Sequence, residues 1–186
     1  TDKRAGIGTI CHEFSHVLGL PDYYLTTENP VTNQRLTPGA WSLMGYGNYL
    51  NDGNTPPNYS VYDKYYLGWL IPTVLATSQP LTIPADGETT YMLTRNEKHV
   101  DEGPYRTDTV YYIENRQQEG WDAYLPGHGM LIWQVIFDEE DWFNNCPNDY
   151  VPRYRLISAV TASSPYTTTK PKPEVPFPGS KNITKY

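Results

Sequence analysis

Residues 12–24, HEFSHVLGLPDYY, place His12 and His16 four positions apart with a glutamate between them. Apolar residues recur here at spacings of three and four, which is the period of an α-helix. Gly19 follows at a position where a left-handed residue commonly ends a helix. The sequence therefore predicts a helix over about residues 3–18 with these residues facing the core: Ile7, Ile10, Cys11, Phe14, Val17 and Leu18.

The two histidines share one side of the predicted helix. Four steps of about 100° overshoot a full turn by only about 40°, so both imidazoles can point at the same place. Their side of the helix also carries Ala5, Gly8 and Thr9, and we expect it to face a cleft. This pattern predicts a metal site. The alternative is a helix with two unrelated surface histidines.

Glu13 and Asp22 complete the predicted site. Glu13 lies about 100° around the helix from His12, where it can reach a metal-bound water but is poorly placed to bind the metal. That is the geometry of a general base. Catalytic zinc takes three protein ligands and leaves a fourth position for water. Because Asp22 follows His16 by six residues, after the reversal at Gly19, it is the expected third ligand.

A second motif, WSLMGYG at residues 41–47, interrupts a stretch rich in Asn, Thr, Gly and Pro that runs from 30 to 57. A loop of that length is either functional or disordered, and its aromatic residues predict order. A tight turn bearing Met44 can place a thioether beneath the histidine rings without competing for the metal. A loop methionine alone is ordinarily core filling, so this interpretation depends on the helix motif before it.

The rest of the chain changes from helical to strand patterns. Residues 60–70, SVYDKYYLGWL, predict a helix with Ser60 as N-cap and Asp63 as its capping partner. After Pro72, short segments rich in Val, Ile, Thr and aromatic residues alternate with Gly, Pro and Asp, which predicts an antiparallel sheet. The expected strands are residues 80–85, 89–95, 108–116, 129–137 and 154–160.

These patterns predict an α+β fold in three parts. Residues 1–72 carry the zinc helix, the methionine turn and the following helix, and residues 73–162 form the antiparallel β-rich part. Residues 163–186 form an extended or disordered tail rich in Pro and Thr, because they hold little that can be buried.

Charge and composition exclude some functions. The chain has 186 residues and a formal net charge of -7 without a long basic run, so no nucleic-acid partner is expected. No window approaches 18 uninterrupted apolar residues and the chain contains no signal segment, so we expect no membrane span. The 17 Tyr, 17 Pro and 5 Trp favour an extracellular protein. Cys11 and Cys146 allow at most one disulfide, and their pairing stays open.

Two weaker signals have simpler explanations. Residues 51–54 (NDGN) and 138–141 (DEED) could offer oxygen ligands to calcium, although solvated polar loops are the simpler interpretation. Four aromatic residues of the strand-rich part could form a binding platform for glycans or peptides, although the core of a small sheet is the simpler interpretation. They are Trp121, Tyr124, Trp133 and Trp142.

The motifs together resemble a known family. HEFSHVLGLPD followed by SLMGY is similar to the metzincin zinc helix and Met-turn. GLPDYY, YDKYYLGW and YYIENRQQEGWDAYLPGHGMLIWQV are most similar to the immune inhibitor A family of secreted bacterial metallopeptidases, over most of residues 1–160. The resemblance implies that the zinc ligands are His12, His16 and Asp22 and that the general base is Glu13. It also implies that Met44 is the Met-turn methionine and that Tyr46 binds metal or stabilises the oxyanion.

The resemblance implies a zinc-dependent endopeptidase that acts on proteins or peptides and is secreted or displayed on a bacterial surface. Metzincins place a sheet before the zinc helix, whereas only 11 residues precede His12 here. We therefore expect a fragment that lacks the N-terminal sheet. Metal binding should survive this loss better than efficient catalytic turnover. The rival hypothesis is a noncatalytic peptidase-like module that contacts glycans or proteins through its aromatic-rich sheet. Oligomeric state stays open.

Overall fold

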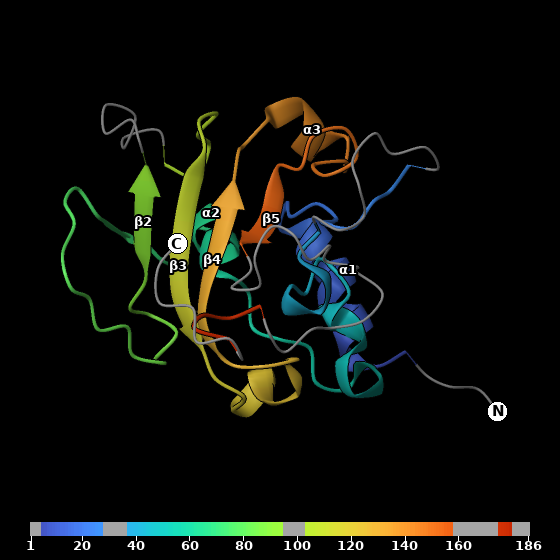
Figure 1. Cartoon of the computed structure of the whole chain (residues 1–186). Coiled ribbons are helices and arrows are strands. Elements are labelled where there is room, and N and C mark those ends of the chain that lie inside the picture. Colours follow the sequence, from blue (N-terminus) through green and yellow to red (C-terminus); the bar gives the residue numbers. More distant parts are fainter. Residues whose placement is uncertain (1–4, 28–36, 95–102, 158–174, 180–186) are drawn as a thin grey trace.

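The computed structural model describes residues 5–27, 37–94, 103–157 and 175–179 (Figure 1). This part of the chain contains short helices and one five-stranded sheet, so the predicted α+β class is confirmed. None of the described helices combines the length and the apolar character needed to cross a membrane. In chain order, with η marking 3-10 helices, the elements are α1 (Ile7–Val17), η2 (Gly39–Trp41), η3 (Gly47–Gly53), α2 (Val61–Tyr66), β1 (Thr73–Val74), β2 (Tyr91–Thr94), β3 (Val110–Arg116), η5 (Gly120–Tyr124), β4 (Gly129–Val135), α3 (Glu139–Phe143) and β5 (Tyr154–Ile157).

The sheet has the strand order β1-β2-β3-β4-β5. Strands β2 to β5 are antiparallel neighbours, as predicted, whereas β1 runs parallel to β2. The long strands β3 and β4 form its centre, with Ile113 opposite Ile132. Figure 1 shows α2 behind this sheet and α1 beyond its β5 edge.

The strand predicted at residues 80–85 is wrong. This segment has no regular structure and is mostly exposed. Pro80 and Pro84 have no backbone N–H to donate to a neighbouring strand, which disfavours pairing along the segment. The short strand β1 occupies the sheet edge instead, and its backbone bonds to β2.

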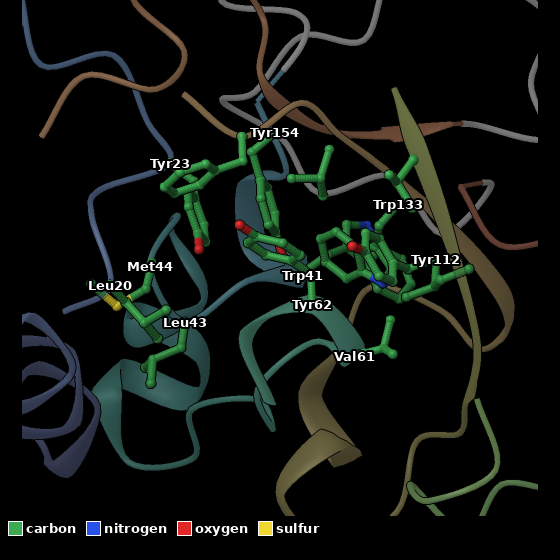
Figure 2. Close-up of a cluster of buried hydrophobic side chains, with 14 of the residues drawn as sticks. Leu20, Tyr23, Trp41, Leu43, Met44, Val61, Tyr62, Tyr112, Trp133 and Tyr154 are labelled. Carbon is green, nitrogen blue, oxygen red and sulfur yellow. The ribbon is translucent and has the colours of Figure 1, made fainter. Parts of the chain in front are cut away.

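One hydrophobic core joins the helical part of the chain to the sheet. Tyr23 stacks on Tyr154 with ring centroids 3.7 Å apart and an angle of 4° between the rings (Figure 2). Tyr62 of α2 lies edge-on to the same Tyr154 ring at 5.6 Å, and Trp133 of β4 lies 5.5 Å from it. All four side chains are buried. The helical and strand-rich parts therefore share one interior.

The capping box predicted for α2 is confirmed, and it carries a buried carboxylate. Asp63 N–H donates to Ser60 Oγ at 3.1 Å, and Ser60 N–H donates to Asp63 Oδ2 at 3.0 Å. The Oδ1 atom accepts from the hydroxyls of Tyr23 at 2.9 Å and Tyr154 at 3.3 Å. Burial raises the pKa of Asp63 to about 6, although the hydrogen bonds from Ser60 and Tyr23 oppose the rise. An ionisable group therefore lies inside the shared core.

Helix α1 is rotated relative to the prediction: Cys11 packs against the core as expected, but most of the predicted apolar face does not. Phe14 is 59% exposed and Val17 is 78% exposed, although both were expected in the core. The buried residues of the helix are Gly8, His12 and Ser15. These residues are small or polar, and they let the backbone of α1 approach η3 closely. Close backbone packing and hydrogen bonds, and not the burial of apolar area, thus decide which face of α1 is buried.

Part of the predicted tail is packed against the sheet. Val175 and Phe177 are buried, and Phe177 exchanges two backbone hydrogen bonds with Met130 of β4, at 2.8 and 3.2 Å. For this segment the expectation of little to bury is wrong, because an apolar side chain on either side of Pro176 covers the sheet. Of the predicted tail, only residues 175–179 belong to the described part of the chain; 163–174 and 180–186 lie outside it.

The raised pKa of Asp63 predicts a pH-dependent stability term. The folded pKa of about 6 exceeds the ordinary value of 3.8, so the folded state holds this proton more tightly than the unfolded chain does. The contribution of Asp63 to stability is therefore largest below pH 3.8 and is lost as the pH rises through about 6. The loss is about 3 kcal/mol, at about 1.36 kcal/mol per pKa unit.

We expect Asp63→Asn to remove this term. Urea unfolding of both proteins between pH 4 and 7 should give a difference in unfolding free energy, parent minus variant, that decreases by about that amount as pH rises. A difference that stays constant over this range would contradict the assignment.

Candidate metal centre

Helix α1 and the turn after it bring three metal-ligating side chains together. His12 and His16 lie on consecutive turns of α1, with ring centroids 4.9 Å apart. Gly19, at φ 99°, reverses the chain, and Asp22 returns onto the two rings. Its Oδ1 atom lies 3.0 Å from His12 Nε2 and 3.4 Å from His16 Nε2. The ligand atoms of the three residues all lie within 4.8 Å of one another.

Backbone carbonyls fix the orientation of both imidazoles. His12 Nδ1 lies 3.0 Å from the carbonyl oxygen of Leu43, and His16 Nδ1 lies 2.8 Å from that of Leu20. A carbonyl only accepts, so in the neutral ring Nδ1 carries the proton and donates it. The lone pair of each Nε2 then faces Asp22. A hydrogen bond from the second ring nitrogen is typical of metal-binding histidines, because it fixes the tautomer and the ring direction.

Asp22 Oδ1 is a buried oxygen without a hydrogen bond among the described residues. Both neighbouring Nε2 atoms carry lone pairs in the neutral rings, so neither donates to it. Two nitrogen lone pairs and a carboxylate oxygen facing one another are costly unless a cation lies between them. Imidazole nitrogen and carboxylate oxygen are donors that zinc takes. The three residues therefore fit a zinc ion.

The same proximity shifts the pKa values of the ligands in opposite directions. Burial alone lowers the pKa of His12, but the contacts with Asp22 and the Leu43 carbonyl outweigh it, and the pKa is raised. Burial alone raises the pKa of Asp22, but the contacts with His12, Asn145 and Tyr24 outweigh it, and the pKa is lowered. The site thus favours a positive charge next to the Asp22 carboxylate. A proton on a histidine nitrogen and a metal ion would compete for this position.

The predicted methionine turn supports the centre through its backbone. Met44 is fully buried in the core beside Leu20 and Leu43 (Figure 2). The Leu43 carbonyl binds His12, and the Met44 carbonyl accepts from the N–H of Tyr23 at 2.8 Å. One tight turn therefore orients a histidine of α1 and also holds the residue that follows Asp22. Backbone carbonyls of this turn thus support the centre, and the place of the Met44 thioether beneath the histidine rings stays a prediction.

Two tyrosines extend the centre toward solvent. The ring of Tyr24 stacks over His12 with centroids 6.3 Å apart, and Tyr46 stacks over Tyr24 at 5.7 Å. Burial raises the pKa of Tyr24, and the nearby Asp22 carboxylate adds to the rise. Tyr46, a predicted site residue, is 41% exposed. Sequence reasoning missed Tyr24, although its place two residues after the third ligand was a usable signal.

Glu13 lies on the solvent side of the centre. Its side chain is exposed, and its negative charge contributes to raising the pKa values of both His12 and Tyr24. It is therefore within electrostatic range of the ligands and their tyrosine neighbour without belonging to the ligand group. A carboxylate in this position can accept a proton from a water held at the centre.

A cavity of about 940 Å³ opens beside His16. Its walls come from the turn after α1, from α2, and from the segment around α3, so both parts of the chain contribute to it. Most lining side chains are apolar or aromatic, among them Leu20, Tyr66, Phe137 and Trp142. An aromatic cavity that reaches a metal-ligating residue has the form of a ligand-binding site.

A helix that carries two histidines four residues apart, with a glutamate after the first and a carboxylate returned onto both, has the ligand pattern of a metallopeptidase. Residues 1–71 match the family model of the immune inhibitor A peptidase M6 catalytic domain. This match supports the immune inhibitor A-like metallopeptidase family for residues 1–71, and over these residues the resemblance noted in the sequence is confirmed. No curated protein and no solved structure matches the chain significantly.

The aromatic platform of the rival hypothesis is not assembled. Trp133 is fully buried and Trp142 is nearly so, because both belong to the core. Trp121 and Tyr124 of η5 are each 51% exposed. The alternative of a four-residue aromatic surface is therefore wrong, and the favoured interpretation as core holds for Trp133 and Trp142.

The predicted calcium segments are unsupported. Asp138 and Asp141 both bind Arg153, at 3.0 and 2.8 Å, so a cation of the chain already neutralises them. The side chain of Asn51, in the other segment, donates to Thr55 at 2.9 Å. Among the described residues, the only group of three or more candidate metal ligands is the centre on α1. Both cysteines are free thiols, so they do not pair.

The close approach of α1 to η3 predicts an unusual effect of an alanine. A Cβ on Gly8 would lie 2.1 Å from the carbonyl oxygen of Asn48, so α1 would have to move away from η3. Gly8→Ala should therefore lower the unfolding free energy by roughly 1–3 kcal/mol, although alanine favours an isolated helix by about 1 kcal/mol.

Val17→Ala is the matched control, because Val17 is exposed on the same helix and alanine has the higher helix propensity. It should change stability by a few tenths of a kcal/mol at most. Thermal unfolding followed by circular dichroism measures both variants. A Gly8→Ala protein as stable as the parent would show that α1 does not pack as described.

Proposed function

We propose that this chain carries the catalytic centre of a zinc-dependent endopeptidase of the metzincin type. The observation that carries the proposal is the convergence of His12 Nε2 and His16 Nε2 on Asp22 Oδ1, a buried oxygen without a hydrogen bond among the described residues. The match of residues 1–71 to a metallopeptidase family model supports a peptidase function. Secretion or display on a bacterial surface is part of the same proposal.

The three ligands are already in position for a metal. His12 Nε2, His16 Nε2 and Asp22 Oδ1 would hold the zinc ion, and backbone carbonyls set the tautomers and directions of the two imidazoles. Bound zinc supplies a Lewis acid and lowers the pKa of a water ligand to about 7. Three protein ligands leave a fourth position, which this chemistry requires.

Glu13 is the proposed general base and acid. Its carboxylate accepts a proton from the attacking water, whose oxygen adds to the carbonyl carbon of the peptide bond. When the C–N bond breaks, Glu13 returns that proton to the leaving amine nitrogen. Its exposure on the solvent side of α1 allows it to meet both water and substrate. Tyr46 is the proposed donor to the developing oxyanion, through a phenol that stacking on Tyr24 holds at the rim of the centre.

The cavity beside His16 supports a protein or peptide substrate. Its walls include the aromatic rings of Tyr66, Tyr105 and Phe137, which suit a large apolar side chain next to the cleaved bond. Because His16 lines the cavity and also belongs to the ligand group, a side chain seated there brings the neighbouring peptide carbonyl to the centre. We therefore expect preference for apolar or aromatic residues near the cleavage site.

Metal content tests the ligand assignment directly. Purified protein loaded with zinc and then dialysed should retain about one zinc per chain by elemental analysis, because three ligands and their supports are pre-positioned. His16→Ala should lose it, since this change removes a ligand whose ring is only half-buried and does little to the core. Equal zinc in both proteins, or none in either, would contradict the site.

Glu13→Gln tests the catalytic assignment. Because Glu13 is not a ligand, the variant should retain one zinc per chain, while hydrolysis of a denatured protein substrate falls by roughly 10²–10⁴-fold. Val17→Ala, an exposed apolar change one turn along the same helix, should hydrolyse at the parent rate. A zinc-loaded parent that does not cleave, or a Glu13→Gln variant as active as the parent, would rule out this mechanism for the chain.

A further inference from the structure

We propose that Asn145 is a positioning residue that sets the direction of the Asp22 carboxylate for the metal centre. The inference rests on the proposed function, because it concerns the same ligand. Asn145 lies 123 residues from Asp22 in sequence and outside the segment that matches the peptidase family model. The strand-rich part of the chain would thus supply a component of the centre that the zinc-helix motif does not contain.

The Asn145 amide binds Asp22 at two points. The backbone N–H of Asp22 donates to Asn145 Oδ1 at 2.6 Å, and Asn145 Nδ2 donates to Asp22 Oδ2 at 2.8 Å. One side chain therefore grips both the main chain and the carboxylate of the same residue. This arrangement fixes the rotamer of Asp22 and occupies Oδ2. The remaining oxygen, Oδ1, is left directed at the two histidines.

The requirement for both a donor and an acceptor explains an asparagine. An aspartate has the shape but would place a carboxylate oxygen against Asp22 Oδ2, and a serine is too short to span both contacts. Asn145 also has φ 58°, in the left-handed region where asparagine is the most tolerant residue after glycine. Its backbone follows α3, where Asn145 N–H donates to the Trp142 carbonyl at 3.2 Å.

The loop that carries Asn145 is held rigidly on the sheet. Asn148 accepts from the N–H of Tyr154 at 2.9 Å and donates to its carbonyl at 2.8 Å, which ties the loop to β5. The same amide donates to the Tyr23 carbonyl at 2.8 Å. Asp149 accepts from both the N–H and the hydroxyl of Thr26, at 2.8 and 2.7 Å. Residues 145–149 therefore hold the segment from Asp22 to Thr26.

Pre-positioning of a ligand raises metal affinity because less freedom is lost on binding. Loss of a residue that orients a ligand typically weakens metal affinity by about 10–100-fold. We expect that range for Asn145, since no other described residue hydrogen-bonds to both the backbone and the carboxylate of Asp22.

Asn145→Gly tests the proposal, because glycine keeps the left-handed backbone and removes only the amide. Asn51→Gly is the matched control. Asn51 also has a left-handed φ, of 51°, and its side chain donates to another side chain, that of Thr55. Zinc dissociation constants are measured by competition with a chromophoric chelator, and the visible spectrum of the cobalt-substituted protein reports ligand geometry. Thermal unfolding of the metal-free proteins reports folding.

The proposal requires that Asn145→Gly bind zinc about 10–100-fold more weakly than the parent, with an altered cobalt spectrum. Asn51→Gly should match the parent in both. Equal affinity and spectrum for Asn145→Gly and the parent would overturn the positioning role while leaving the proposed function intact. A parent without zinc affinity would overturn both. Should Asn145→Gly not fold, Asn145→Asp keeps size and backbone preference, and an unchanged cobalt spectrum in that variant would overturn the role.

Discussion

The approach of Asp22 Oδ1 to two histidine nitrogens is the constraint on which the rest of the structure depends. Three groups rich in lone pairs are held within a few ångströms, which costs free energy unless a cation joins them. Such an arrangement persists only when its members are fixed from outside. The carbonyls of Leu43 and Leu20 fix the rings, and Asn145 fixes the carboxylate. Each support comes from a different segment, so the centre depends on the whole fold.

The segment Asp22–Tyr24 shows how the centre and the core are joined. Asp22 faces the histidines, Tyr23 enters the core and stacks on Tyr154, and Tyr24 returns to stack over His12. Successive residues of this bent segment therefore serve the centre and the core in turn. Tyr23 cannot leave the core without moving both neighbours. The shared aromatic interior therefore determines how accurately the third ligand and its tyrosine are placed.

The sequence was sufficient wherever the signal was local. The spacing of His12 and His16, the return to Asp22 and the Ser60 capping box each involve a few residues, and the structure brings each set together. Asn145 could not be found in this way, because nothing in its own neighbourhood relates it to a residue 123 positions away. The strand predicted at residues 80–85 failed for a different reason, since its composition suited a strand but its two prolines did not.

The rotated orientation of α1 follows from the centre itself. A helix has one side that can approach the Leu43 carbonyl, and His12 must lie on it. Gly8 and Ser15 lie four before and three after His12, so they share that side, and their small size permits the contact with η3. Apolar residues such as Phe14 and Val17 are then forced outward by the helical period. Hydrophobic periodicity finds the helix correctly but misassigns its faces. The buried side is set by His12, which has to reach both the Leu43 carbonyl and Asp22.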